Sequence, residues 1–111
     1  MIDSKNLAKE APETTIFARL THDVILRTGD SGENLAILHC IGDEDRVFTV
    51  GYWLKPLNAK KRRLLWQYLF TGTTVRLVGQ WEQHDWTDRH GLPHSWDFQA
   101  HYIETVPPPE A

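Results

Sequence analysis

Three histidines, two aspartates, one tryptophan and one arginine stand within eleven residues near the C-terminal end of this chain, in the stretch HDWTDRHGLPH, residues 84–94. Imidazole and carboxylate groups can bind a metal ion or transfer protons. An indole, an imidazole and a guanidinium instead offer flat faces on which unstacked nucleic-acid bases bind. The stretch therefore admits three kinds of chemistry: a metal site, a catalytic cluster or a stacking surface.

The spacing argues against the first two. His84, His90 and His94 lack the helical or knuckle spacing that prepares a tetrahedral zinc site, and no cysteine stands beside them. No Ser, Cys or Lys occupies a recognisable setting for an activated nucleophile. We therefore predict no metal, no cofactor and no catalytic residue, and we expect a protein that is not an enzyme.

The elements that position this stretch follow from the periodicity of apolar residues. Alternation with a period of two predicts five strands, over about residues 14–27, 35–41, 46–54, 73–82 and 95–106. Between the third and fourth of these, apolar residues at i,i+4 spacing predict a helix over residues 58–70. Asn58 is its expected N-cap, and Gly72 is the expected residue just beyond its end.

The remaining segments are predicted to be irregular. Residues 1–13 are expected to form a flexible arm, and the proline-rich residues 107–111 a disordered tail, which leaves one domain over residues 14–106. Residues 82–94 are expected to be a long, mobile loop between the last two strands. The stretch KKRR, residues 60–63, is expected first of all to be a solvated helix face, and otherwise a contact for phosphates or for an acidic partner.

Two quoted stretches carry a resemblance to a known fold. The sequence GTTVRLVGQWE, residues 72–82, leads over the loop to SWDFQAHYIE, residues 95–104. This pair resembles the end of many OB-fold domains, small single-stranded-DNA-binding proteins among them. The resemblance spans about residues 14–106 and implies a mainly β fold, a five-stranded Greek-key barrel with one α-helix between strands 3 and 4. It also implies that residues 82–94 form one of the two loops that flank ligands in OB domains.

The resemblance implies a binding surface on strands 1–3 and on this loop. Phe17, Trp53 and Trp86 would stack on bases, whereas Arg19, Lys55, Arg76 and Arg89 would contact phosphates. The predicted nucleic-acid-binding residues are Phe17, Arg19, Trp53, Lys55, Arg76, His84, Trp86 and Arg89. Two other interpretations stay open at this point: Trp53 covers a seam or a dimer contact, and Trp86 folds back on the barrel.

The predicted partner is single-stranded DNA or RNA, although the net charge of -3 lacks the basic excess usual for nucleic-acid binders. The alternative is a protein-interaction OB domain, an accessory subunit of a DNA-processing or secretion assembly. A homodimer is compatible with both. The single cysteine, Cys40, allows no internal disulfide and is expected in the core. With no apolar run of membrane-spanning length, we expect a cytoplasmic protein without membrane contact.

Overall fold

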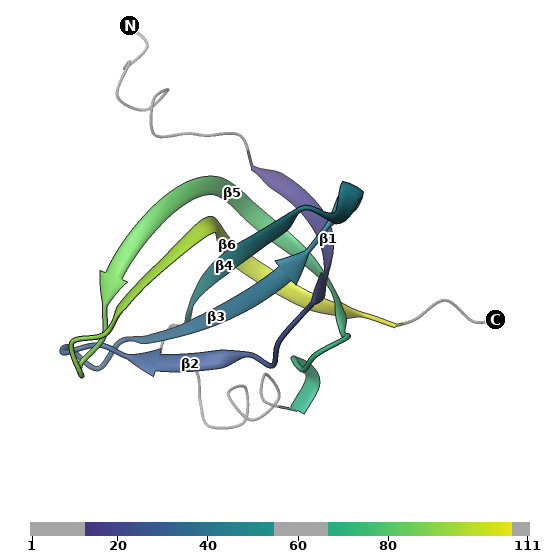
Figure 1. Cartoon of the computed structure of the whole chain (residues 1–111). Coiled ribbons are helices and arrows are strands. Elements are labelled where there is room, and N and C mark those ends of the chain that lie inside the picture. The colour runs from purple at the N-terminus through teal and green to yellow at the C-terminus, as the bar shows by residue number, and fades with distance from the viewer. Residues whose placement is uncertain (1–12, 55–66, 108–111) are drawn as a thin grey trace, which may run out of the picture.

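A computed structural model describes residues 13–54 and 67–107 of the chain. One mixed sheet dominates it, so the predicted mainly β fold is confirmed (Figure 1). A short 3-10 turn, η1 (Asp43–Asp45), joins its third and fourth strands. The strands are β1 (Thr14–Leu20), β2 (Ile25–Thr28), β3 (Asn34–Ile41), β4 (Val47–Leu54), β5 (Thr74–Thr87) and β6 (Pro93–Val106).

Apart from β2, which is paired with β3 alone, the described strands form a closed ring of neighbours. Hydrogen bonds link the strands in the order β1-β5-β6-β4-β3-β2, and an additional pairing joins β1 to β3. The β4–β6 pair is parallel, and every other pair is antiparallel. In Figure 1 the long β5–β6 hairpin arches over β3 and returns toward the end of β2. The hairpin can therefore cover the outer face of the strands beneath it.

The single strand predicted over residues 14–27 is wrong, because the chain leaves the sheet between β1 and β2. Over residues 13–54 and 67–107 the chain therefore forms six strands, where five were predicted. The break occurs where the chain changes partner, from β5 for β1 to β3 for β2. In the bend, the Asp23 carboxylate accepts hydrogen bonds from the backbone N–H and the hydroxyl of Thr71, at 2.8 and 2.9 Å. These bonds lower the pKa of Asp23 and fix the bend.

The long loop predicted over residues 82–94 is also wrong. The two strands continue to Thr87 and from Pro93, so only residues 88–92 connect them. The extended part pairs His84 with Trp96 and Trp86 with His94, after a bulge between Trp81 and His84. The sequence looks like a loop because this part of the hairpin leaves most of its side chains exposed, which favours polar residues.

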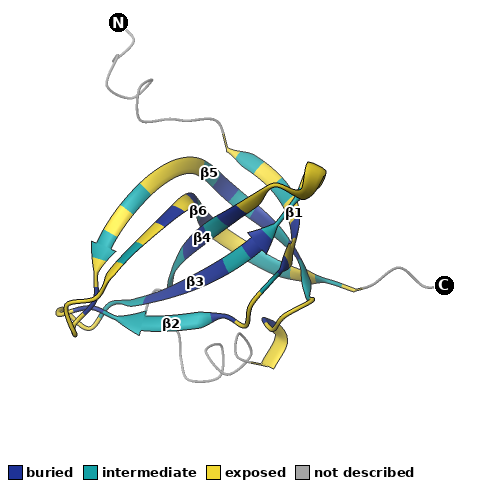
Figure 2. Cartoon of the chain, viewed as in Figure 1, coloured by how far each residue is buried: buried dark blue, intermediate teal, exposed yellow. Residues whose placement is uncertain are grey.

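The main core lies inside the ring of strands. β3 is buried over much of its length (Figure 2), as its apolar character on both faces predicts. Cys40 is fully buried as predicted, and burial raises the pKa of its thiol to about 12. The core side chains are Ala18, Leu20, Val24, Ala36, Leu38, Cys40, Phe48, Val50, Leu54, Leu69, Val75, Leu77, Phe98 and Ala100.

Gly79 lets β5 and β6 approach closely at a bulge between Val78 and Gly79. A Cβ atom at this position would lie 2.0 Å from the carbonyl oxygen of Gln99, so only glycine fits. The irregular register also changes which side chains of β6 face inward. Tyr102, which the alternation predicts to be inward, is 46% exposed, and Ile103 packs against the core instead.

Several predicted segments lie outside the described residues. They are residues 1–12 of the arm, 108–111 of the tail and most of the helix predicted over 58–70. Of that helix, Gln67 and Tyr68 are described and helical, and Leu69, 2% exposed, packs in the core. Across residues 13–54 and 67–107, the structure contains no helix of the length and apolar character that crossing a membrane requires.

Candidate functional site

A second hydrophobic cluster lies on the outer face of the sheet, under the β5–β6 hairpin. We call it the tryptophan cluster, and it consists of the buried residues Leu35, Ile37 and Trp96 with the partly buried Ile25, Trp53 and Trp86. Its members come from β2, β3, β4, β5 and β6. Residues far apart in the sequence therefore meet at one place, where the end of the hairpin folds over β3 and β4.

The rings of this cluster contact one another edge to face. Trp53 lies 5.3 Å from Trp86 and 5.9 Å from Trp96 between ring centroids, with interplanar angles of 89° and 77°. His84 stacks on Trp96 at 5.7 Å, and His94 lies tilted against Trp86 at 5.9 Å. Aromatic rings favour such geometries because positive ring edges meet negative ring faces. The cluster is therefore held by specific ring contacts as well as by burial.

Trp96 rests directly on the backbone of β4. A Cβ atom at Gly51 would lie 2.5 Å from two atoms of the Trp96 ring, so a side chain at this position would displace the indole. The indole N–H of Trp96 donates a hydrogen bond to the side-chain oxygen of Gln99 at 2.9 Å. The sequence predicts a bend or a close approach of another backbone at Gly51. The structure instead places a ring there.

Asp88 organises the tip of the hairpin. Its buried carboxylate accepts hydrogen bonds from the backbone N–H groups of His90 and Leu92, at 2.8 and 3.0 Å, and lies 2.8 Å from Nε2 of His94. Nε of Arg27 on β2 lies 4.0 Å away. The bond from His94 is the main cause that lowers the pKa of Asp88 to about 2, although burial acts in the opposite direction.

The tip also joins the turn between β2 and β3. The backbone N–H of Arg89 donates to the carbonyl oxygen of Thr28 at 2.9 Å. Together with the Arg27–Asp88 ion pair, this bond docks residues 88–92 against the end of β2. Neither the role of Asp88 nor the ring contacts of Trp96 were predicted from the sequence. An Asp followed by a Gly three residues later is a turn signal that could have identified Asp88.

Four of the eight predicted site residues gather here. Trp53, Trp86 and His84 lie in or against the tryptophan cluster, and Arg89 lies exposed at the hairpin tip. Trp53 and Trp86 are each partly covered, because their rings contact each other. This contact agrees with the interpretation in which Trp86 folds back on the sheet. Each indole still keeps part of its surface in solvent.

Three predicted residues lie elsewhere. Arg19 pairs with Ile41 and Trp53 pairs with Leu35, so the two are separated by six residues along β3, about 20 Å. Phe17 lies beside Arg19 on the exposed face of β1. The structure therefore does not bring these two residues together with the tryptophan pair.

Arg76 is engaged by residues of β6. It forms an ion pair with Glu104, which raises the pKa of Arg76 and lowers that of Glu104. Its guanidinium also lies 5.4 Å from the ring centre of Tyr102. A phosphate contact by Arg76 would have to compete with this carboxylate. The eighth predicted residue, Lys55, lies outside the described residues.

Charge is distributed unevenly along the chain. The described residues contain 12 Asp and Glu against 5 Arg and no Lys, a net charge of -7 with His neutral. Residues 55–63 alone contain five of the chain's 12 basic side chains. A polyanion would therefore meet few cations on the part of the surface that the structure describes.

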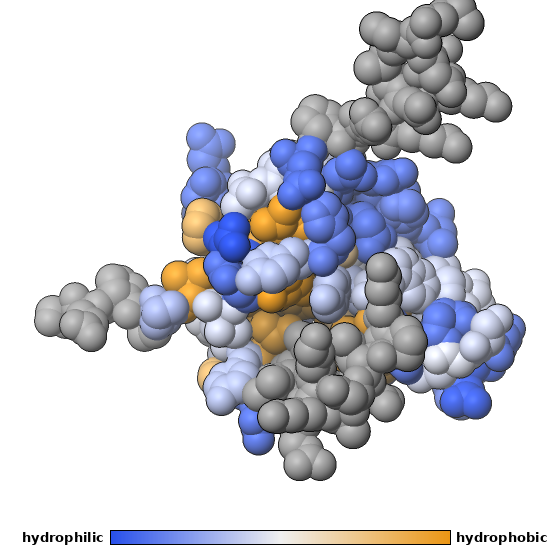
Figure 3. Space-filling model, turned by 180° about the vertical axis from the view of Figure 1, so that it is seen from behind, coloured by the Kyte–Doolittle hydropathy of each residue, from blue (hydrophilic) through white to orange (hydrophobic). Residues whose placement is uncertain are grey.

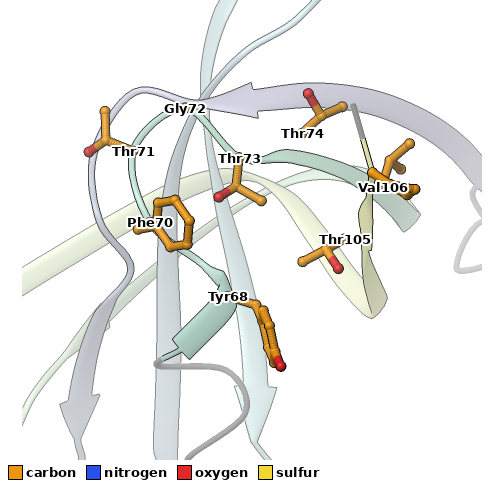
Figure 4. A pocket seen from close by; sticks show the side chains of 9 residues that line it. Tyr68, Phe70, Thr71, Gly72, Thr73, Thr74, Thr105 and Val106 are labelled. Atoms are coloured by element: carbon orange, nitrogen blue, oxygen red, sulfur yellow. The ribbon is translucent and has the colours of Figure 1, made fainter. Parts of the chain in front are cut away.

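A pocket of about 470 Å³ lies at the start of β5 and the end of β6 (Figure 4). Seen from behind, hydrophobic residues are exposed on this side of the molecule (Figure 3). The described lining residues carry no charged side chain, so they offer neither a cation for a phosphate nor a charged acid–base group. They are Tyr68, Phe70, Thr71, Gly72, Thr73, Thr74, Thr105, Val106 and Pro107. Within the described ranges, no group of three or more His, Cys, Asp or Glu side chains is arranged to hold a metal ion.

No protein-family model matches this chain, and no curated protein matches it significantly. The fold and the site geometry therefore have to carry the functional argument. They define a mainly β protein with an aromatic cluster between the β2–β3 turn and the tip of a long hairpin.

Proposed function

We propose that this chain is a non-catalytic OB-fold protein that binds single-stranded nucleic acid, DNA or RNA. The observation that carries the proposal is the position of the Trp53–Trp86 pair, partly exposed between the β2–β3 turn and the hairpin tip. Base–aromatic stacking tolerates any sequence, because every base has a flat face. The site therefore suits a ligand that is recognised by its single-strandedness.

The strand order supports the OB-fold part of the proposal. If β1 and β2 are taken as two halves of one bent strand, the ring of neighbours becomes first-second-third-fifth-fourth-first. The third and fifth strands of that ring, β4 and β6, are the parallel pair. A five-stranded Greek-key barrel of the OB type has such an arrangement, with ligands between two loops at one side. The helix over residues 58–70 remains a prediction.

Stacking would use the exposed parts of the two indoles. A base that inserts between Trp53 and Trp86 would replace their edge-to-face contact with a stacked contact on at least one face. His84 and the exposed Arg89 supply a further flat ring and a cation nearby. Because the described residues carry a net charge of -7, we expect modest affinity and a salt dependence that reflects only a few phosphate contacts.

Titration of the full chain with a dT oligomer, monitored by tryptophan fluorescence at two salt concentrations, tests the proposal. We expect quenching that saturates, with weaker binding at the higher salt concentration. Substitution of either Trp53 or Trp86 by Ala should cost about 1–3 kcal/mol of binding free energy. Trp81→Phe is the matched control, because Trp81 contacts Phe48 and Phe98 and lies outside the tryptophan cluster. Unchanged fluorescence at low salt would refute the proposal.

The second candidate is a protein-interaction OB domain, an accessory subunit of a DNA-processing or secretion assembly. Exposed apolar side chains favour it: Phe17 is 55% exposed and Val47 is 70% exposed. The net negative charge of the described residues points in the same direction. This candidate replaces the first if oligonucleotides fail to bind. A cytoplasmic location and a homodimer remain predictions.

A further inference from the structure

Phe17 stands between two pockets at the end of the sheet where β3 turns into β4. One pocket, of about 280 Å³, is lined by Ile16, Phe17, Gly42, Asp43, Glu44, Arg46, Phe48 and Trp81. The other, of about 320 Å³, is lined by Phe17, Ala18, Arg19, Ile41, Gly42, Asp43, Asp45 and Thr74. The two share Phe17, Gly42 and Asp43, so they adjoin each other, and the one aromatic side chain common to both is that of Phe17.

The apolar part of this surface is exposed and held in place. Phe17 is 55% exposed and Trp81 is 36% exposed. The Trp81 ring makes edge-to-face contacts with Phe48 at 5.1 Å and with Phe98 at 5.0 Å, and both of those residues are buried in the main core. These contacts fix the indole, so it cannot turn inward to remove its apolar surface from water.

The surroundings favour a cation. The guanidinium of Arg46 lies 4.4 Å from the centre of the Trp81 ring, which shows that this face already accepts a positive group. The turn η1 adds Asp43, Glu44 and Asp45, all exposed, and none of their carboxylates has an ion-pair partner within the described ranges. Arg46 lines one pocket and Arg19 the other, so three acids stand against two cations and the rim of the pockets is net negative.

We propose that these two pockets dock a basic peptide segment of a partner protein. We call the surface the acidic-turn site, made of Phe17, Trp81, Asp43, Glu44 and Asp45. In an extended peptide, residues i and i+2 point to the same side about 7 Å apart, so two apolar side chains can straddle Phe17. The Lys or Arg side chains between them start from the other side of the peptide backbone, and their long, flexible stems reach around its edge to Asp43 and Glu44. Charge complementarity selects a cationic chain and repels nucleic-acid phosphate.

This proposal is independent of nucleic-acid binding. Arg19, which lines one of the two pockets, is about 20 Å along β3 from the position that pairs with Trp53. Failure of oligonucleotide binding would therefore leave the acidic-turn site untouched, and failure of peptide binding would leave the tryptophan cluster untouched.

The test is an NMR titration of the full, ¹⁵N-labelled chain with three tetrapeptides: acetyl-Leu-Lys-Leu-Lys-amide, its Gln counterpart and its Glu counterpart. The Lys peptide should shift the amide signals of Gly42, Asp43 and Glu44 and the indole N–H of Trp81, with saturation. The Gln peptide should bind several-fold more weakly, and the Glu peptide should leave these signals in place. Equal binding of the Lys and Gln peptides would overturn the proposal.

Two double variants test whether the Lys peptide binds at the acidic-turn site. Asp43→Asn/Glu44→Gln should weaken binding of the Lys peptide several-fold, whereas Asp30→Asn/Asp85→Asn, which removes two exposed charges elsewhere, should not. Because all four side chains are exposed, folding should survive in both variants. Equal loss in both variants, or shifts confined to other residues, would overturn the proposal. So would concentration-dependent shifts at Gly42 and Trp81 without peptide, since they would assign the surface to a second copy of the chain.

Discussion

Aromatic and acidic side chains gather near both ends of β3, but the two ends differ in what covers these side chains. At one end, the hairpin folds over the sheet, and Trp96 is 2% exposed. At the other end, no described segment covers Phe17 and Trp81, which are 55% and 36% exposed. The comparison shows that an aromatic residue is structural or available for binding according to what folds over it. Its position in an alternating pattern does not decide this.

The charges differ as well. At the hairpin end, Asp88 is engaged by three hydrogen-bonding groups and by Arg27. At the other end, the carboxylates of Asp43 and Glu44 project into solvent. An engaged carboxylate holds the fold together, whereas an exposed one remains able to attract a partner. The two ends should therefore respond differently to the same kind of substitution.

The largest expected effect is on the free energy of unfolding, and it should differ between the two ends of β3. Trp96→Ala should lower the free energy of unfolding by about 3–5 kcal/mol, because it empties a fully packed position. Trp81→Ala should cost clearly less, since more than a third of that side chain is already in solvent. Urea unfolding of both variants measures the difference. An equal or larger loss for Trp81→Ala would contradict the contrast.

Stability should be nearly as sensitive to substitution of Gly51, on which the Trp96 ring rests. Gly51→Ala places a Cβ atom against the indole and should destabilise the protein by about 1–3 kcal/mol, the usual cost of overpacking. Gly32→Ala is not a suitable control, because Gly32 has a positive φ of 81°. Thr49→Ser, which removes one methyl group from the same strand, is the better control. Unfolding by urea with no change for Gly51→Ala would show that the ring can move aside.

Each end of β3 should bind its own ligand, so a substitution at one end should leave binding at the other end unchanged. Trp86→Ala should weaken dT-oligomer binding by about 1–3 kcal/mol and leave binding of the Lys peptide unchanged. Phe17→Ala should weaken peptide binding and leave the oligomer unaffected. Fluorescence and NMR titrations of the two variants give the four measurements. If one substitution weakens both ligands alike, the two ends form one site, as the sequence analysis predicted for Phe17 and Trp86.

The smallest effect concerns pH. The pKa of Asp88 falls from its ordinary value of 3.8 to about 2 in the folded chain, so its stabilising contribution is complete above about pH 4. As the pH falls from 4 to 2, the unfolded chain takes up the proton first, and this contribution is lost. The difference in unfolding free energy between the wild type and Asp88→Asn should therefore narrow over that range. Asp30→Asn, an exposed control, should follow the wild type. A difference that stays constant down to pH 2 would contradict the role of Asp88.

Much of the sheet could be predicted from the sequence. The inward residues Phe48, Val50 and Leu54 and the outward Trp53 follow from the alternation along one strand. Cys40 lies in the core, as its apolar neighbours in the sequence predict. These predictions succeed because the two faces of a strand alternate with each residue, whatever lies across the sheet.

Two features could not be predicted in this way. The bend between β1 and β2 keeps the same apolar alternation, so the pattern does not reveal that the chain changes partner there. The stretch HDWTDRH is polar enough to be a loop, but pairing with β6 makes most of it a strand. Both outcomes depend on pairing with other segments, about fifty residues away for the bend and across the hairpin for HDWTDRH. The periodicity within a segment carries no information about such pairing.

The sequence by itself determined the class of fold, the strand faces and the presence of aromatic residues beside charged ones. Only the tertiary structure decided which of them meet. Trp53, Trp86 and Trp96 come together because the hairpin crosses over β4, while Phe17 and Arg19 end up about 20 Å along β3 from Trp53. The physical reason is that alternation arises from the geometry of a single strand. Contact between distant side chains arises from how strands curve and pair.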